Sequence, residues 1–417
     1  MFVKKNVFGI VKSVSFVVAL TTGLTTVTAV LSPVAMAAEK AQQLSSKMKP
    51  LGEAQKLMGE KKWKEALAII NDKVVPITGK SAYEESLTNE FKSACLMQLK
   101  DYAGVAKVYE TMLAANQVPA DQVAQRTITL AELYLSLGDY SKGIDTYERY
   151  LKNNPATPDV TLGLTQAYFK KGDYKNSAEY AQKLIKQAEA AKKPVDKNWL
   201  QILGYSYSKL GNNAAYADVL GKLIELYPTP EYWNDMLKIT RNEVTFTDRE
   251  KIEYYRLKKT VGAMTADEYN EMAELSLSLL DSGDAKAALE AGIAAGVVPA
   301  TDRTNKLLAR AKADAATDLA TLDATAKEAA GKPNGEPLAK IGAAYLGHGL
   351  NDKALATVQS AIAKGGLKSV DESYVRLGVA NLNLGKKADA IKAFQSVSDK
   401  SNLARVAKLW ILYANKK

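Results

Sequence analysis

One motif that could do chemistry resembles the end of a phosphate-binding loop. Such a loop needs the pattern Gly-x-x-x-x-Gly-Lys-Ser, which surrounds phosphates with backbone N–H groups and a lysine. The run Gly79-Lys80-Ser81 supplies the last three residues, but Val74 stands where the first glycine is required. The motif is therefore incomplete, and we interpret it as part of an ordinary loop.

Two Ser-x-x-Lys pairs have the spacing of a nucleophilic serine and its basic partner in some acylating enzymes. They are Ser46 with Lys49 and Ser206 with Lys209. A chain this rich in serine and lysine produces such matches by chance. Neither pair predicts catalysis.

Cysteine and histidine occur once each, as Cys95 and His348. One cysteine forms no internal disulfide, and one histidine excludes any site that needs two imidazoles, which includes most zinc centres. Cys95 falls between Ala94 and Leu96 in a predicted helix, where we expect a small buried residue. His348 lies between two glycines at a predicted helix end, where we expect it to cap carbonyl groups.

The adjacent carboxylates Glu84 and Glu85 are expected in a polar loop, without the apolar surroundings that a catalytic acid needs. No other group of residues combines a nucleophile, a base and a charge-stabilising partner. The sequence therefore predicts a protein that is not an enzyme and that carries no metal or cofactor.

The composition is that of a folded protein, with 47% hydrophobic and 24% charged residues. A length of 417 residues corresponds to two or three domains of ordinary size, or to one elongated chain of small units. The formal charge of +10 arises from 47 lysines and only 9 arginines. Lysine does not contact a phosphate or a guanine edge in bidentate fashion. We interpret the excess charge as a solvated surface and expect no nucleic-acid partner.

Residues 1–37 have the pattern of a secretory signal peptide. A lysine-containing start is followed by an uncharged run over 14–31 and by small residues over 33–37. A retained membrane anchor is the alternative, but threonines dilute the hydrophobic run. We expect cleavage before Ala38, a periplasmic location, no stable membrane insertion after cleavage, and stability that comes from packing rather than from disulfides.

A pattern of about 34 to 39 residues recurs through the rest of the chain. Each copy has a helix with a small residue and a tyrosine on one face, then a turn, an aromatic residue and a second amphipathic helix. The clearest copies are Leu130-Ala131-x-x-Tyr134-x-x-x-Gly138-Asp139-Tyr140, Leu164-Thr165-x-x-Tyr168-x-x-x-Gly172-Asp173-Tyr174 and Leu203-Gly204-x-x-Tyr207-x-x-x-Gly211. Less complete copies have their turns near 61–63, 100–102, 283–284, 349 and 385. We count eight units and two weaker ones.

Close packing of two antiparallel helices explains this pattern. Small residues on both helices let the two backbones approach, while tyrosine and leucine fill the space between them. These small residues are Ala131, Gly204, Gly342 and Gly378 on first helices and Gly143, Ser177, Ala288, Ala354 and Ala390 on second helices. One helix pair buries too little apolar surface to be stable alone, so neighbouring pairs must stack. The predicted fold is an all-α, right-handed superhelical solenoid of antiparallel helix pairs.

The repeated residues resemble those of the tetratricopeptide repeat family, whose pattern is Trp-x-x-Leu-Gly-x-x-Tyr, Ala-x-x-x-Phe and a terminal proline. The resemblance covers about residues 47–400 and implies an exported bacterial protein of this family. Trp199 departs from the pattern by one position. Residues 231–268 and 301–334 keep a helical period without the small residues, so we expect one degenerate helix pair in each.

The expected organisation has five parts. The first part, over 1–37, is the signal peptide. The repeats divide because tyrosine is frequent before residue 269 and scarce after it. The other four parts are N-terminal repeats over 38–233, connecting helices over 234–268, C-terminal repeats over 269–401 and a capping helix over 402–417.

The family resemblance implies that first helices line a concave groove that binds peptides or partner helices. By the repeat register, the groove residues are Glu132, Leu135, Gln166, Phe169, Gln201, Tyr205 and Ser208. The lysine and asparagine clamp that some family members use for a C-terminal carboxylate is not matched, because Leu51 and Gln55 occupy its first positions. The expected partner is a protein or peptide of the cell envelope, for example of a TonB-type import system or of pilus or outer-membrane assembly.

A second hypothesis is an accessory protein whose tyrosine-rich groove binds glycans or peptidoglycan. The tyrosines motivate this hypothesis, but most of them stand at packing positions and are expected to be buried. Neither the partner nor the oligomeric state follows from the sequence.

Overall fold

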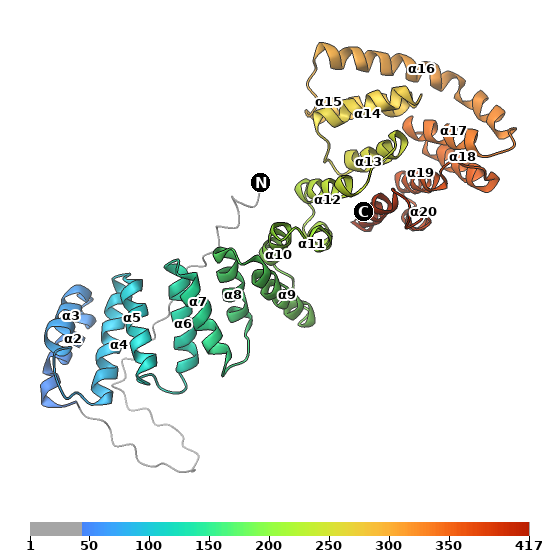
Figure 1. The fold of residues 1–417 in the computed structure, drawn as a ribbon. Helices are drawn as coiled ribbons and strands as arrows, with labels where there is room; N and C mark the ends of the chain where they lie inside the picture. Colours follow the sequence, from blue (N-terminus) through green and yellow to red (C-terminus); the bar gives the residue numbers. More distant parts are fainter. Residues whose placement is uncertain (1–43, 417) are drawn as a thin grey trace. The chain divides into compact units, whose positions relative to one another are not determined.

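The computed structural model describes residues 44–416, in which helices follow one another through short turns (Figure 1). The chain divides into two compact units, with unit 1 ending at Asn212 and unit 2 beginning at Asn213. Most consecutive helices within each unit pack against one another. The predicted fold class, an all-α solenoid of helix pairs, is confirmed. The predicted signal peptide lies outside the described residues.

Unit 1 is a stack of helix pairs. The second helix of each pair packs on the first helix of the next pair. A short 3-10 turn, η2 (Ser46–Met48), precedes the stack, and a π turn, η3 (Ile70–Val74), follows its second helix. The helices are α2 (Lys49–Gly59), α3 (Trp63–Ile69), α4 (Ala82–Gln98), α5 (Tyr102–Ala114), α6 (Val123–Ser136), α7 (Tyr140–Leu151), α8 (Pro158–Lys171), α9 (Tyr174–Ala190) and α10 (Lys197–Lys209).

The turns inside the pairs share one backbone geometry. Gly138 and Gly172 adopt left-handed φ angles of 80° and 84°, which glycine reaches without steric cost. Lys61 and Lys100 adopt φ angles of 59° at the corresponding turns, which confirms the less complete copies predicted there. An aspartate such as Asp173 then begins the second helix by accepting a hydrogen bond from a backbone N–H in its first turn.

The small residues of the pattern are at the helix contacts, as predicted. A Cβ atom on Gly378 would lie 2.3 Å from Cε1 of Phe394, and one on Gly342 would lie 2.5 Å from Val358. Gly163 in unit 1, which is not among the predicted small residues, is packed as closely: a Cβ atom there would lie 2.3 Å from the hydroxyl oxygen of Tyr147. Contacts this short require glycine because packed interiors leave no room for a further methyl group.

Unit 2 also consists of consecutive helices, but its last helices return to its first. The C-terminal helix α21 packs on α20 and also on α11 and α13, and α13 packs on α19. The helices are α11 (Asn213–Leu226), α12 (Pro230–Glu243), α13 (Asp248–Thr260), α14 (Ala266–Ser278), α15 (Ser282–Ala294), α16 (Asp302–Ala330), α17 (Glu336–Gly347), α18 (Asn351–Lys364), α19 (Val370–Asn383), α20 (Lys387–Gln395) and α21 (Ala404–Lys416).

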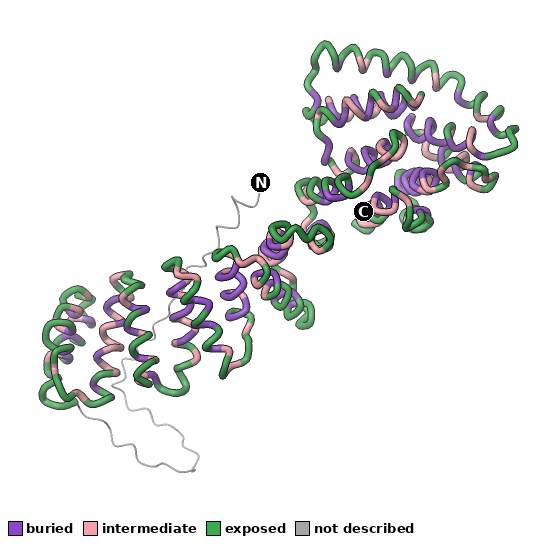
Figure 2. The backbone as a smooth tube through the Cα atoms, viewed as in Figure 1, coloured by how far each residue is buried: buried purple, intermediate pink, exposed green. Residues whose placement is uncertain are grey.

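The degenerate pair expected over 301–334 is instead the single 29-residue helix α16. No glycine or proline interrupts the sequence between Asp302 and Ala330, and its alanines and lysines favour helix throughout. A narrow stripe of α16 is buried, and most of its surface is exposed (Figure 2). The pair expected over 231–268 is present as α12 and α13.

The two compact units divide after Asn212, in the turn of the third clear copy of the pattern. The predicted organisation into repeat blocks, with its division at 233, stays a prediction. Helix α10 packs on α9 in unit 1, whereas α11 packs on α12 and α21 in unit 2. The two helices of this copy therefore belong to different units.

Candidate functional site

The seven predicted groove residues lie on three first helices of unit 1, as expected from the repeat register. Six of them are half-buried and Ser208 is exposed, so all seven are accessible in part. Helix α6 carries Glu132 and Leu135, α8 carries Gln166 and Phe169, and α10 carries Gln201, Tyr205 and Ser208. Their role in binding stays a prediction.

Three rings meet where α8, α9 and α10 come together. The centroid of Phe169 lies 5.3 Å from that of Tyr205 and 6.0 Å from that of Tyr174, and the two tyrosine rings are 5.8 Å apart. All three pairs are edge-to-face, with interplanar angles of 62° to 73°. We call Phe169, Tyr174 and Tyr205 the aromatic cluster. Each ring is half-buried, so the cluster offers apolar surface to a partner.

Tyr174 was missing from the predicted groove residues. It is the first residue of α9, directly after the Gly172-Asp173 turn, and this turn brings its ring back to the end of α8. The repeat register places groove residues on first helices alone. The aromatic residue after each turn is part of the sequence pattern, and it is the signal that points to Tyr174.

Leu135 has a packing role as well as an exposed side. A Cβ atom on Gly143 of α7 would lie 2.5 Å from its Cδ2 atom, so the leucine fills the space that this glycine leaves. Glu132, one turn earlier on α6, is partly withdrawn from water. Burial, together with the Asp159 carboxylate, raises the pKa of Glu132.

Cationic groups border the aromatic cluster. The Lys209 ammonium lies 5.3 Å from the centroid of the Tyr205 ring, within the range of a cation–π interaction. Lys171 is exposed at the end of α8, two residues after Phe169. The site therefore combines apolar rings, the amide side chains of Gln166 and Gln201, and positive charge.

The residues considered for nucleophilic chemistry are in structural positions. Cys95 is buried, as predicted, and burial raises the pKa of its thiol to about 11. Ser206 is buried and its hydroxyl donates to the backbone oxygen of Ile202. Lys80 donates to the carbonyl groups of Val74, Val75 and Ile77 and so closes a loop.

Two expectations about single residues were wrong. Glu84 lies in the first turn of α4 and not in a loop, where it forms a capping box with Ser81 and accepts from the backbone N–H of Ser45. Hydrogen bonds from Ser45 and Ser81 lower the pKa of Glu84 to about 2. His348 ends α17, but Nε2 of its imidazole lies 2.7 Å from Oδ2 of Asp318 on α16, so the ring pairs with a carboxylate.

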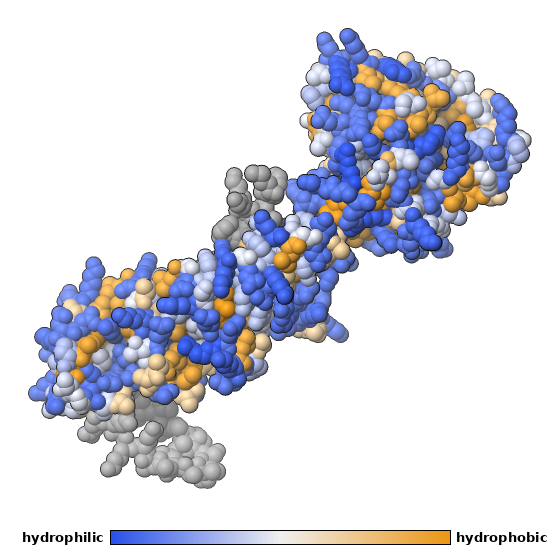
Figure 3. Space-filling view, viewed as in Figure 1, coloured by the Kyte–Doolittle hydropathy of each residue, from blue (hydrophilic) through white to orange (hydrophobic). Residues whose placement is uncertain are grey.

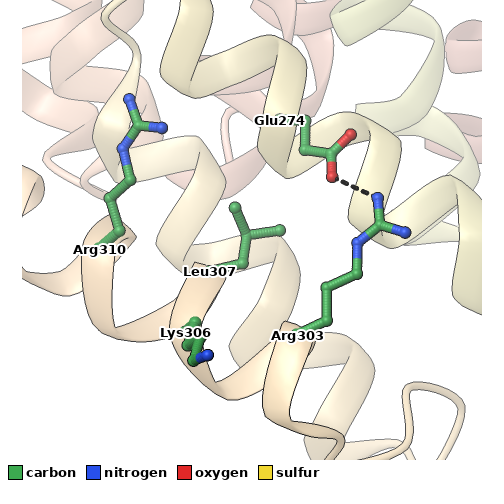
Figure 4. A pocket seen from close by; sticks show the side chains of 5 residues that line it. All are labelled: Glu274, Arg303, Lys306, Leu307 and Arg310. Atoms are coloured by element: carbon green, nitrogen blue, oxygen red, sulfur yellow. Dashed lines mark hydrogen bonds and ion pairs between the residues drawn. The ribbon is translucent and has the colours of Figure 1, made fainter.

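A second hollow surface lies between α14 and α16 in unit 2, with a volume of about 460 Å³. Figure 4 shows Arg303 reaching from α16 to Glu274 on α14, with a nitrogen–oxygen distance of 2.8 Å. Lys306, Leu307 and Arg310 continue along the same helix. Glu274 pairs with Arg303, and Arg310 lies 3.4 Å from Asp314. Paired surface charges of this kind do not define a ligand.

Five charged residues form a buried cluster at the centre of unit 2. Arg256 pairs with Glu253 at 2.6 Å and with Asp284, while Arg376 pairs with Glu253 at 2.7 Å and with Glu372 at 3.0 Å. We call these residues the buried charge cluster. Burial alone would raise the pKa of Asp284, but the Arg256 guanidinium overcomes it, so the pKa is lowered.

Asp281 lies next to this cluster, at the start of α15, and is buried. Burial and the Asp284 carboxylate raise its pKa to about 6, although nearby arginines oppose the shift. Such a shift is typical of functional sites, but also of structural ion networks. Here the paired groups join α13, α15 and α19, and their arrangement is that of a structural network.

Among residues 44–416, no group of histidine, cysteine and carboxylate side chains is suited to hold a metal ion. No helix in that part of the chain is both long and apolar enough to cross a membrane. Hydrophilic residues dominate the visible face of both units, and hydrophobic side chains reach it in small patches (Figure 3).

The segments of the chain that match a known protein family lie within the repeats described above. The tetratricopeptide repeat pattern matches residues 128–194 and 340–402, and a second tetratricopeptide repeat pattern matches 200–230. These segments are tetratricopeptide repeats. The match over 200–230 spans the boundary between the units.

Solved structures that are similar to this chain include other repeat proteins. A tetratricopeptide repeat protein from Parabacteroides merdae is 12% identical, with 80% of this chain and 99% of that chain covered and a TM-score of 0.30. The C-terminal part of a repeat-containing protein from Cytophaga hutchinsonii is 18% identical, with 62% and 99% covered and a TM-score of 0.33. The TPR2AB domain of yeast Sti1, solved as a complex with pHSP90, is 13% identical, with 71% and 100% covered and a TM-score of 0.25. No curated protein matches the chain.

Proposed function

We propose that this repeat protein is a non-enzymatic scaffold that binds a peptide segment of another cell-envelope protein on the first-helix surface of unit 1. The observation that carries the proposal is the aromatic cluster, because three half-buried rings from three consecutive helices converge there. Aromatic residues at the centre of an interface contribute much of the binding energy. Two of its rings, Phe169 and Tyr205, are among the seven predicted groove residues, which lie on α6, α8 and α10.

The chemistry of the surface favours a peptide over other ligands. The rings of Phe169 and Tyr205 suit an aliphatic or aromatic side chain of the partner. The amides of Gln166 and Gln201 have the donors and acceptors that an extended backbone requires. Lys209 at the border adds a preference for an acidic residue.

Unit 2 is less suited to this role because its own helices fill its interior. Helix α13 packs on α19 and α21, and seven consecutive residues from Ile252 to Lys258 are buried. We therefore assign the groove to unit 1. The glycan-binding alternative is not favoured, since the rings of the aromatic cluster meet edge to face and form no flat stacking platform.

The proposed location is the periplasm, which the pattern of residues 1–37 supports. Systems for TonB-type import and for pilus or outer-membrane assembly are the proposed context. A fusion of the full-length chain to alkaline phosphatase tests the location, because that enzyme is active only after export. An inactive fusion would contradict it.

Site-specific photo-crosslinking in cells tests the groove. A photoreactive residue at Gln166 or Ser208 should capture a distinct protein, whereas one at the exposed Gln187 on α9 should not. Replacing Phe169 and Tyr205 by alanine should reduce the captured product about 10-fold or more. The same products at Gln187, or none at either groove position, would refute the proposed surface.

A further inference from the structure

Besides the hollow between α14 and α16, unit 2 has a hollow that is lined by α18, α19 and α20. Its volume is about 430 Å³. The lining residues are Leu355 and Gln359 of α18, Tyr374, Leu377 and Asn381 of α19, and Lys386, Asp389, Lys392, Ala393 and Ser396 in or beside α20.

The repeat register explains why this hollow exists. In the copies that end their first helix at Gly138, Gly172 and Gly349, a tyrosine stands four positions before the glycine. These residues, Tyr134, Tyr168 and Tyr345, are all buried. In the copy that ends at Gly385, the corresponding residue is Asn381.

The tyrosines fill the space between the helix before them and the second helix of their own pair. The Tyr168 ring stacks on Tyr180 of α9 at 5.6 Å, and its hydroxyl donates to Glu148 of α7 at 2.8 Å. Tyr345 likewise donates from α17 to Asp323 of α16 at 2.7 Å.

Asn381, which is buried, has a shorter side chain than tyrosine at this position. Its side-chain nitrogen donates to the backbone oxygen of Leu377 at 3.0 Å within its own helix. In the repeat register, Ala393 of α20 takes the place that Tyr180 has in α9. Asn381 and Ala393 are together smaller than Tyr168 and Tyr180 by about the volume of two tyrosine rings.

The hollow is lined by apolar side chains, and two lysines give its edge a positive charge. Leu355, Tyr374 and Leu377 are half-buried, while Lys386 and Lys392 are exposed. Within residues 44–416, no ion pair involving either lysine is formed, and Asp389 is the one carboxylate in the lining.

We propose that this hollow receives an aromatic side chain of a partner protein, with acidic residues beside it that meet Lys386 and Lys392. The partner's ring takes the position that tyrosine has in the copies ending at Gly138, Gly172 and Gly349, so shape and apolar contact select it. The two lysines select the acidic neighbours. This surface belongs to unit 2 and is independent of the groove proposed in unit 1.

Methyl-labelled full-length protein provides the test. The acetylated and amidated tripeptides Glu-Tyr-Glu, Lys-Tyr-Lys and Glu-Ala-Glu are titrated while the NMR signals of Leu355, Leu377 and Ala393 are followed. Glu-Tyr-Glu should shift these signals, and the other two peptides should bind at least 10-fold more weakly. Equal binding of the three peptides, or no binding of Glu-Tyr-Glu, would overturn the proposal.

The substitution Asn381→Tyr separates binding from folding. The new ring should occupy the hollow as Tyr168 does in its own repeat, so the protein should remain folded and lose the peptide. Gln395→Tyr adds a ring on the exposed side of α20 and should leave binding unchanged. Persistent binding by a folded Asn381→Tyr protein would contradict the site.

Sedimentation measurements distinguish a second copy of this chain from a different partner. Under the proposal, Asn381→Tyr does not reduce any self-association of the protein. A dimer that is lost in Asn381→Tyr but kept in Gln395→Tyr would overturn it and assign the hollow to a second copy.

Discussion

Arg376 of α19 donates from Nε to Oε1 of Glu253 in α13 across 2.7 Å, and 123 positions separate the two residues in the sequence. Both side chains are buried, and Glu253 also accepts from Arg256. A buried guanidinium and carboxylate must remain paired, because a single buried charge is costly. This contact fixes α13 against the C-terminal repeats and keeps the interior of unit 2 closed.

Removing Arg376 should therefore destabilise unit 2 strongly. Arg376→Met leaves Glu253 and Glu372 with one cation fewer, and we expect a loss of about 3–5 kcal/mol. Chemical denaturation monitored by hydrogen exchange of α13 and α19 measures it. Arg303→Met removes the exposed pair with Glu274 and should cost less than about 1 kcal/mol. Similar losses in the two variants would contradict the role of the buried charge cluster.

Asp281 should make unit 2 less stable as the pH rises. Its folded pKa of about 6 lies above the ordinary value of 3.8, so the folded state holds the proton more tightly. The ionised form therefore opposes folding above pH 6, and this effect disappears below about pH 4.

Asp281→Asn should remove this effect. The variant should be more stable than the parent by about 2–3 kcal/mol at pH 7.5 and about equal to it at pH 4. Urea unfolding of both proteins at the two pH values is the measurement. A gain that is the same at both values would show that titration of Asp281 is not its cause.

Gly378 should not tolerate a methyl group. In Gly378→Ala the new Cβ atom would lie 2.3 Å from the Phe394 ring, and such overpacking costs about 1–3 kcal/mol. Gly221→Ala in α11 is the matched control, because nothing lies within 4 Å of its Cβ position. That variant should gain about 0.5–1 kcal/mol from helix propensity. Thermal unfolding of both proteins should give shifts of opposite sign.

Glu84 should anchor the start of unit 1. Its carboxylate accepts the backbone N–H groups of Ser45 and Ser81 at 2.7 Å and 2.9 Å. The lowered pKa means that this contribution is complete above the ordinary value of 4.5 and is lost as the pH falls through about 2. Glu84→Gln should therefore speed hydrogen exchange in α2 at pH 7, whereas Glu85→Gln, one residue further on, should change it less. Equal exchange in both variants would contradict this anchor.

Much of the fold follows from local sequence. The Gly-Asp turns at Gly138 and Gly172 and the close contact at Gly378 are recognisable because each requirement involves neighbouring residues or one helix pair. The repeat period therefore predicted helix pairs, their turns and the candidate groove helices. The predicted groove omits Tyr174 because the register places groove residues on first helices, whereas Tyr174 begins a second helix and meets Phe169 of its own repeat and Tyr205 of the next.

Long-range packing decided the remaining features. The amphipathic period of 301–334 is the same for two short helices and for one long helix, and α16 combines a sequence without glycine or proline with contacts to α15 and α17. The pairing of Glu253 with Arg376 has no local signal, because it depends on two helices that meet only after the chain has returned on itself. The sequence by itself determined the repeat and its turns, whereas the tertiary structure decided where the units divide, which charges are buried and which repeat leaves a hollow. Local turn geometry acts between neighbouring residues, but burial depends on what the rest of the chain places beside them.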